Sequence, residues 1–545
     1  MASVAAVAAV AVGVAFTGFV GSASAATAAT TLTVNANQVL RPVTHVATGS
    51  LYGLANATQP SVALAQAIKP NTFVQMPQGG KQQPTGDISV VAPTAVAVGA
   101  KLVNRLSDYY AGWPYQFSWN TWTPFVTSQI NAMKSSSYYN SISAYELWNE
   151  SDNTWKTANG TYESFWTTTF RQVRSLDPNK PIQGPSFSDN ISDMENFLRN
   201  AVATNTVPDI LAWHELSSAS KIAGDVAKVQ AIEDKLGISR RPVAIEEYAA
   251  PSEVGLPGPL VSYVAKFERL GIRDAELAFW NQSGTLGDLL TARGGSPNAA
   301  YWMYTWYGAM NGNMVVTNPP AQTGIDGFAS VPSAKNQVSV IAGNCNGSCA
   351  VTVNGLNTLS LGSTVNVKVE QTVSQGRTVA SAGPSTISTT SYTPAGGTIT
   401  VPINMATNNA YRITITPGSG SGTTTPPTTP STTGPTTPPT SPPTSPPTGS
   451  GCGATVSLNQ WNGGYVATVR VTAGAAAVNG WTVTVPISSD SPLTSVWNAT
   501  NVGTSGSVGF HNVSYNAQIA AGGYVEFGFQ GTGTGPAGTP VCAAA

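Results

Sequence analysis

Charged residues are scarce in this sequence. Only 9% of its 545 residues are Asp, Glu, Lys or Arg, and the formal net charge is −1. No basic patch stands out, so we expect no nucleic-acid partner, because phosphate backbones are held mainly by clustered Lys and Arg. A polar, weakly charged surface suits a neutral partner better. The chain is also too long for one ordinary hydrophobic core, so two or three domains are expected.

Cysteine and histidine are scarce too, with four and three residues. No histidine lies near a cysteine in the sequence, so we expect no metal site and no cofactor. Cys345 and Cys349 lie in the turn "CNGSC", and Cys452 and Cys542 bracket the C-terminal segment. Two disulfides with this local pairing are the most economical interpretation, and a metal site is the alternative.

Long apolar runs are absent beyond the N-terminus, so no later stretch is expected to cross a membrane. Residues 1–25 combine an apolar run with the small residues Ala23-Ser24-Ala25, which form an A-x-A cleavage pattern. We expect a signal peptide, a secreted extracellular protein and no membrane partner after cleavage. The run lacks the usual preceding Lys or Arg, and the alternative is an apolar N-terminal helix or membrane anchor.

Residues 418–451 contain no charge and almost no apolar side chain. They cannot bury a core, and their Pro-Pro pairs favour an extended polyproline II conformation. We expect a Pro/Thr/Ser-rich linker there, which separates the C-terminal segment 452–545 from the rest of the chain.

Residues 40–312 alternate short apolar runs with longer mixed segments. Segments 124–133 and 261–270 have apolar residues at helical spacing. Strands that alternate with helices predict parallel βα units, and eight such units in about 270 residues predict a (β/α)₈ barrel. The eight candidate strands lie in residues 45–53, 71–77, 100–107, 143–150, 180–187, 209–216, 241–248 and 274–281.

The composition and the spacing of apolar residues change after the expected barrel. Residues 313–416 are rich in Val and Thr, alternate in polarity and are punctuated by Gly and Asn, which predicts an antiparallel β-sandwich. The segment from Cys452 onward has the same pattern, so a second all-β domain is expected at the C-terminus. The predicted fold class is therefore α/β for the barrel, followed by two β-sandwich domains.

Acidic residues lie at the ends of two candidate strands. Glu150 ends the fourth, and Glu246 and Glu247 end the seventh. Catalytic groups of such barrels gather at the C-terminal ends of the strands, so these acids are expected at one mouth. Paired carboxylates suit glycoside hydrolysis, in which one is the general acid and the other the nucleophile. The alternative is that they form structural ion pairs or helix caps.

The residues Trp148-Asn149-Glu150 and the pair Glu247-Tyr248 resemble the motifs of clan A retaining glycoside hydrolases. A sandwich after the barrel is similar to glycoside hydrolase family 39, and the resemblance covers about residues 40–416. It implies that Glu150 is the acid/base and Glu247 the nucleophile, and that Asn149 forms a hydrogen bond with the sugar 2-hydroxyl. Strand alternation is expected to turn Glu246 toward the barrel wall or a neighbouring loop.

His214, Tyr248 and Trp280 complete the expected substrate-binding set. His214 is similar to a clan histidine near the nucleophile, but Leu216 stands where the clan often has Tyr, so its hydrogen bond stays unassigned and a buried structural histidine is the alternative. Trp280 resembles the aromatic floor under a bound sugar, although a lone Trp is more often a core residue. The aromatic-rich loop 106–122 is expected either to wall the substrate cleft or to fold over its own small core.

Residues 452–545 resemble a bacterial family 2 carbohydrate-binding module, through "QWNGGY", "NGWTVTVPI", "SVWNAT" and "FGFQG". The resemblance implies that Trp461, Trp497 and Tyr515 form a flat strip that stacks on cellulose, with Tyr515 where Trp is more usual. Trp481 matches a buried position. The alternative is that all these aromatic residues belong to the core.

The sequence therefore predicts a secreted, retaining glycoside hydrolase. Its expected partners are a plant cell-wall polysaccharide, or its oligosaccharides, as substrate and cellulose as anchor. One alternative is an endo-acting xylanase, mannanase or glucanase rather than an exo-glycosidase. Another is a non-catalytic polysaccharide-binding protein on a decayed barrel, and the presence of both Glu150 and Glu247 argues against it.

Overall fold

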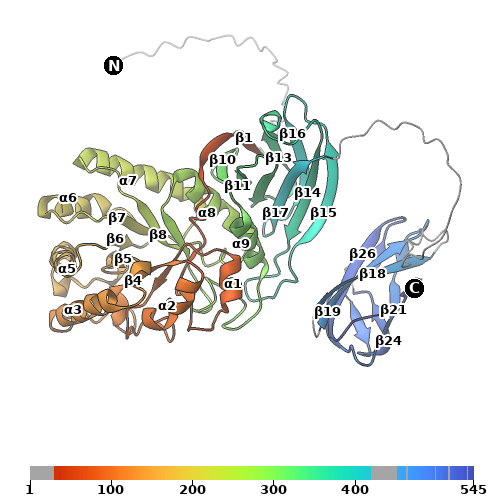
Figure 1. The fold of residues 1–545 in the computed structure, drawn as a ribbon, viewed down its shortest axis with the longest axis horizontal. Coiled ribbons are helices and arrows are strands. Elements are labelled where there is room, and N and C mark those ends of the chain that lie inside the picture. Colours follow the sequence, from red (N-terminus) through yellow and green to blue (C-terminus); the bar gives the residue numbers. More distant parts are fainter. Residues whose placement is uncertain are drawn as a thin grey trace, which may run out of the picture. The chain divides into compact units, whose positions relative to one another are not determined.

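The computed structural model describes residues 30–418 and 451–544, apart from 462–463, 498, 514–515 and 537 (Figure 1). The expected signal peptide and almost all of the expected linker lie outside the described residues. The chain divides into two compact units, residues 1–425 and 426–545. Each unit is described by itself below.

A closed barrel of eight parallel strands forms the first half of the larger unit. Neighbours along the chain are neighbours in the barrel, and β9 pairs with β2 to close it. Each of the eight expected strands is present, so the predicted (β/α)₈ barrel is confirmed. The strands are β2 (Gly49–Leu51), β3 (Thr72–Gln75), β4 (Lys101–Arg105), β5 (Ile142–Glu146), β6 (Ile182–Phe187), β7 (Ile210–Glu215), β8 (Val243–Tyr248) and β9 (Asp274–Leu277).

Helices follow the strands and cover the outside of the barrel (Figure 1). In α5 the buried residues recur at helical spacing, and the Thr161 side chain accepts a hydrogen bond from the Ser164 amide to cap the helix. Helix α8 begins with Pro257, and Gly271 in a left-handed conformation follows its end. The α-helices are α1 (Val62–Ala67), α2 (Ile88–Ala97), α3 (Trp119–Ser135), α4 (Ser151–Thr154), α5 (Tyr162–Leu176), α6 (Met194–Thr204), α7 (Ile222–Leu236), α8 (Pro257–Leu270) and α9 (Ala299–Ala309).

The β-sandwich expected after the barrel is present, but it also recruits the chain that precedes the barrel. Strand β1 (Thr31–Pro42) pairs antiparallel with β10 and parallel with β13, and its alternate residues Leu32, Val34 and Ala36 enter the sandwich core. The barrel is thus bracketed in sequence by strands of one neighbouring sheet. The other strands are β10 (Asn313–Asn318), β11 (Asp326–Val331), β12 (Val338–Gly343), β13 (Gly347–Asn354), β14 (Val365–Thr372), β15 (Ser385–Tyr392), β16 (Ile399–Met405) and β17 (Ala410–Pro417).

The smaller unit is an all-β domain, as predicted. Its core contains Trp481, Phe510, Phe527 and Phe529, and Trp481 is buried as its sequence pattern predicted. The strands are β18 (Cys452–Trp461), β19 (Gly464–Ala473), β20 (Val478–Asn479), β21 (Trp481–Ile487), β22 (Leu493–Trp497), β23 (Thr500–Val502), β24 (Gly506–His511), β25 (Gln518–Ile519), β26 (Tyr524–Thr532) and β27 (Val541–Ala544).

Both expected disulfides are formed. Cys345 is bonded to Cys349 in the sandwich of the larger unit, and Cys452 is bonded to Cys542 across the ends of the smaller one. In the described parts of the chain no helix is both apolar and long enough to span a membrane.

Candidate active site

A cavity of about 270 Å³ opens at the C-terminal ends of the barrel strands. It brings together the two expected catalytic acids, Glu150 and Glu247, with Asn149 and Trp280. Several lining residues come from loops that the sequence analysis did not connect with the site. The full lining is Leu51, Tyr52, Gln82, Gln83, Arg105, Trp113, Tyr115, Asn149, Glu150, Leu216, Glu247, Phe279 and Trp280.

Glu150 lies beyond the end of its strand rather than at it. Strand β5 ends at Glu146, and Glu150 adopts a left-handed conformation with φ 47° as α4 begins. Its amide donates to the Ser186 carbonyl at 2.7 Å, and the Thr154 hydroxyl donates to the Glu150 carbonyl at 2.9 Å. A non-glycine residue held in this region by its neighbours is typical of functional sites. The turn directs the Glu150 side chain into the cavity.

A β-bulge determines where the two acids of β8 point. The register between β7 and β8 shifts after Trp213, so that His214 pairs with Glu247 and Glu246 is the extra residue. Both acids then reach the inside of the barrel: Glu247 lines the cavity, and Glu246 accepts a hydrogen bond from Gln183. The expectation that Glu246 faces the barrel wall or a loop was wrong, because strict alternation fails across a bulge.

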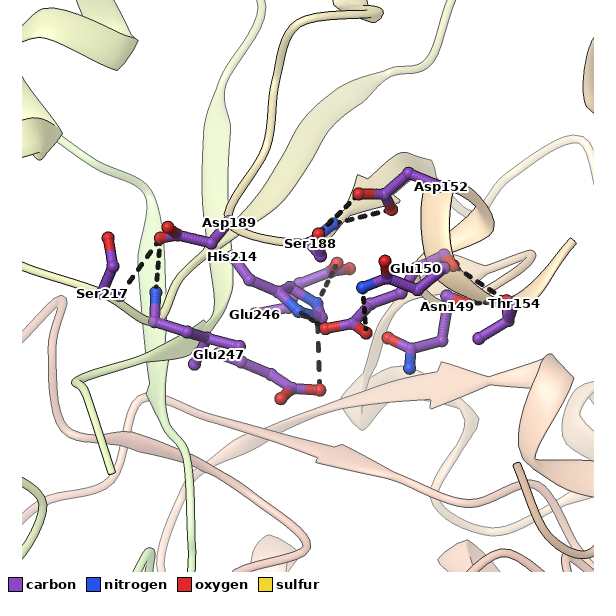
Figure 2. Close-up of polar contacts among 12 residues, drawn as sticks. Asn149, Glu150, Asp152, Thr154, Ser188, Asp189, His214, Ser217, Glu246 and Glu247 are labelled. Atoms are coloured by element: carbon purple, nitrogen blue, oxygen red, sulfur yellow. Dashed lines mark hydrogen bonds and ion pairs between the residues drawn. The ribbon is translucent and has the colours of Figure 1, made fainter. Parts of the chain in front are cut away.

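His214 lies between the acids (Figure 2). Its Nδ1 is 2.9 Å from Glu150 Oε1, and its Nε2 is 3.8 Å from Glu247 Oε1 and 3.9 Å from Glu246 Oε2. The hydrogen bond that the sequence left unassigned is therefore made to Glu150. His214 is fully buried and stands behind the cavity wall rather than in it.

These contacts shift the pKa values of His214 and Glu150 in opposite directions. Burial is the largest influence on His214 and acts to lower its pKa, but the charges of Glu247 and Glu150 outweigh it and raise the pKa. Burial acts to raise the pKa of Glu150, and the hydrogen bonds and charge of His214, together with Asn153, outweigh it and lower the pKa. Both shifts favour a charged His214–Glu150 pair in the free site.

Arg105, at the end of β4, holds Glu247 from the other side. Its Nη1 is 2.7 Å from Glu247 Oε1, and its Nε is 2.8 Å from Glu146 Oε2. The guanidinium is buried and orients Glu247 through a charge-assisted hydrogen bond. The sequence analysis missed Arg105, although a cation at the end of a barrel strand in a chain with few charges was an available signal.

Aromatic residues form the rim of the cavity. The side chains of Trp280 and Trp113 are 43% and 50% exposed, which is unusual for Trp. Tyr52 and Tyr115 also line the cavity, and both phenols donate to the buried carboxylate of Asp108. In the same segment, Phe117 and Trp122 pack against Phe165 of α5, and Trp122 is buried. Both alternatives for this loop thus hold in part.

Tyr248, like His214, is an expected site residue that does not line this cavity. Tyr248 is fully buried, and its hydroxyl contacts the Ala47 carbonyl at 2.8 Å and the Tyr304 hydroxyl, so it supports β8 from behind. In the smaller unit, Trp461 and Trp497 end strands β18 and β22, but their side chains and the whole of Tyr515 lie outside the described residues.

One set of metal-ligating groups is close together among the described residues. Ligand atoms of Glu150, His214 and Glu247 all lie within 4.8 Å of one another. His214 Nδ1 is already engaged by Glu150, and the Arg105 guanidinium places a fixed positive charge on Glu247. A divalent cation bound here would be repelled by the Arg105 guanidinium, unless that side chain moved away. These residues therefore fit an acid–base site better than a metal site.

Comparison with known proteins finds a family for the smaller unit and relatives for the chain. Residues 452–544 match the family model CBM_2, described as "Cellulose binding domain". The chain is also similar to the 3-O-alpha-D-galactosyl-alpha-L-arabinofuranosidase of Bifidobacterium longum subsp. longum, at 23% identity over 69% of this chain and 40% of that protein. It is also similar to the 3-O-beta-L-arabinopyranosyl-alpha-L-arabinofuranosidase of Bifidobacterium pseudocatenulatum, at 25% identity over 68% of this chain and 46% of that protein. The chain spans less than half the length of these curated relatives.

The barrel and sandwich have a glycoside hydrolase-like fold, and a CBM2 domain follows them. Among solved structures, N2152 from Neocallimastix frontalis is 34% identical, with a TM-score of 0.69, and the match covers 72% of this chain and all of that one. At this identity and coverage, the chain belongs to the family of N2152.

Proposed function

We propose that this protein hydrolyses glycosidic bonds with retention of configuration, with Glu247 as nucleophile and Glu150 as acid/base. The observation that carries the proposal is the grouping of Glu150, His214 and Glu247 at the barrel mouth. One carboxylate oxygen of each glutamate and one ring nitrogen of the histidine lie within 4.8 Å of one another. Retaining enzymes hold their two carboxyl groups about 5–5.5 Å apart, whereas inverting enzymes leave about 6.5–9.5 Å for a water molecule. The short separation supports a double displacement.

The contacts of each acid suit its proposed role. Arg105 holds the Glu247 carboxylate in place, so that it can attack the anomeric carbon and form a glycosyl ester. Glu150 donates a proton to the leaving oxygen, and then removes a proton from the water that cleaves the ester. The pKa of Glu150 is low in the free site, and a bound sugar that excludes water strengthens the burial that acts to raise it. His214 orients Glu150 throughout.

We propose that the substrate is an α-L-arabinofuranosyl linkage in a plant cell-wall polysaccharide or its oligosaccharides. Both curated relatives carry names of arabinofuranosidases that recognise a 3-O-substituted arabinose. A cavity of about 270 Å³ with two exposed tryptophans at its rim suits a neutral sugar of limited size, since aromatic faces stack on sugar C–H groups. This favours an exo-acting enzyme over an endo-acting xylanase, mannanase or glucanase.

The CBM2 domain supports a role in holding the enzyme on cellulose, and the N-terminal pattern supports secretion. The domain has three charged residues, and two of them, Arg470 and Glu526, pair with each other at 2.9 Å. Its surface is therefore nearly neutral, which suits an uncharged polysaccharide. We propose Trp461, Trp497 and Tyr515 as the cellulose-binding residues.

The test is product analysis. The purified protein is incubated with arabinan, arabinogalactan, xylan, mannan and cellulose, and with aryl α-L-arabinofuranosides. We expect arabinose-containing mono- or disaccharides from the first two, and NMR of the nascent product should show the anomer of the substrate. Glu247→Gln should abolish turnover, and Glu163→Gln, on the outer helix α5, is the matched control. Adsorption to polysaccharide without any product would instead support a non-catalytic binding protein.

A further inference from the structure

The sandwich reaches the active-site mouth through one loop. Residues 373–384, between β14 and β15, dock on the barrel loops that follow β8 and β9. The Asn298 side-chain amide donates to the Arg377 carbonyl at 2.8 Å, and the Ser381 amide donates to the Pro297 carbonyl at 2.9 Å. The loop is therefore part of the packing around the mouth, although it belongs to the sandwich in sequence.

Arg377 is the centre of this contact. Its Nε donates to the Val254 carbonyl at 3.1 Å, and its Nη2 donates to the Pro251 carbonyl, so it holds the loop after β8. Its Nη1 lies 3.7 Å from Asp288 Oδ2, in the loop after β9. Gly255 allows this close approach, because a Cβ there would lie 2.7 Å from the Arg377 Cγ and the residue has φ +81°.

Asp288 links Arg377 to Trp280. Its side chain is fully buried, and its Oδ2 accepts hydrogen bonds from the amides of Trp280 at 2.7 Å and Asn281 at 2.8 Å. Its Oδ1 accepts from the Gln282 amide at 3.2 Å. The indole of Trp280 in turn donates to the Ala249 carbonyl at 3.3 Å, in the loop after β8. Trp280 thus sits between the two loops that Arg377 ties together.

We propose that Arg377 is a positioning residue for substrate recognition, through which the sandwich fixes Trp280 as a sugar platform. The inference rests on the proposed function only in that Trp280 faces a bound sugar. Arg377 touches none of the catalytic groups. Glu150 and Glu247 are held by separate contacts from His214 and Arg105, so a change at Arg377 should alter sugar binding more than the chemical step.

Arg412 provides a matched control. It lies in the same sandwich, its side chain is 27% exposed against 22% for Arg377, and it pairs with Glu370 at 2.6 Å. Its guanidinium also lies over Trp306 of the barrel helix α9, at 5.1 Å from the ring centroid. Arg412→Ala therefore removes a similar cation between sandwich and barrel, but away from the mouth.

The experiment compares Arg377→Ala, Arg377→Lys and Arg412→Ala in the full chain. For Arg377→Ala we expect KM for an arabinan-derived oligosaccharide to rise about tenfold, as expected for the loss of one stacking contact, while kcat changes less than about twofold. Arg377→Lys should recover part of the loss, because an ammonium can pair with Asp288 but cannot also bond both carbonyls. Arg412→Ala should leave KM unchanged.

Hydrogen–deuterium exchange provides a readout that does not depend on turnover. The amides of Trp280, Asn281 and Gln282 should exchange faster in Arg377→Ala than in the wild type, and not in Arg412→Ala. Equal exchange and equal KM in the two alanine variants would overturn the inference. A wild-type protein that turns over no glycoside would refute the proposed function, and the exchange comparison would still decide whether Arg377 positions Trp280.

Discussion

Replacing Glu246 with Gln separates the two neighbouring acids of β8 by both stability and activity. Glu246 is fully buried, accepts a hydrogen bond from Gln183, and lies 3.9 Å from His214 Nε2. Burial raises its pKa to about 7, and the charge of Arg105 and the hydrogen bond from Gln183 only partly oppose that rise. Glutamine has nearly the same shape and no charge, so the substitution removes the titration while keeping the packing.

The sign of the effect follows from the two pKa values. In the unfolded chain a glutamate titrates near its ordinary value of about 4.5, whereas in the folded protein Glu246 titrates near 7. Between these values the folded state holds a proton that the unfolded state has released, so the free energy of unfolding falls as the pH rises through this window. A difference of about 2.5 units corresponds to roughly 3 kcal/mol when ionisation is complete.

The assay is urea unfolding of the larger unit at pH 5, 6, 7 and 8, with tryptophan fluorescence as the readout of unfolding. Relative to the wild type, Glu246→Gln should gain stability progressively across this range, by up to about 3 kcal/mol at pH 8. Glu163→Gln, on the outer helix α5, is the control. The variant should also keep most of its turnover, because Glu247 is the proposed nucleophile. Parallel pH profiles for variant and wild type, or a loss of turnover as large as that of Glu247→Gln, would refute the reasoning.

Three further predictions concern catalysis and anchoring. Glu150→Ala should slow substrates with poor leaving groups severely and activated aryl glycosides much less, and equal losses in a leaving-group series would contradict its acid role. Arg105→Lys should lower kcat by about a hundredfold at similar KM, because one ammonium cannot replace the fork that holds two carboxylates; steady-state kinetics on one arabinoside test this. Replacing both Trp461 and Trp497 with Ala should weaken cellulose adsorption by tens-fold, nearly independently of salt, and leave soluble-substrate turnover unchanged; a matching drop in turnover would argue against an independent anchor.

The sequence predicted the barrel because its signals are local. Each strand is a short apolar run, and residues at the C-terminal end of a barrel strand face the mouth whatever the rest of the fold does. The sequence alone therefore predicted that Glu150 and Glu247 lie at the same mouth of the barrel. Strand β1 could not be assigned to the sandwich, because its partners β10 and β13 are more than 270 residues away along the chain. Alternation in each segment predicts a strand, but it does not say which distant strand is the partner.

Local irregularities account for what was predicted incorrectly at the site. The bulge in β8 turns Glu246 inward against the alternation rule, and the left-handed turn at Glu150 carries that acid four residues past the end of β5. Neither feature has a glycine or proline to mark it. Arg377 shows a different limit: it influences the mouth through Asp288, and nothing near either residue in the sequence connects them.

Four of the chain's few charged residues lie inside the barrel, where burial makes a charge costly. Arg105, Glu146, Glu246 and Glu276 are all fully or nearly fully buried inside the barrel, and burial raises the pKa of each of the three acids. Both carboxyl oxygens of Glu276 are buried without a hydrogen-bond partner in the described part of the chain. Apolar side chains would fill such a barrel more stably. The interior instead keeps Arg105 between Glu146 and Glu247, where it fixes the position of the proposed nucleophile. These buried charges lower stability beneath the mouth, and Arg105 among them positions the nucleophile of the proposed reaction.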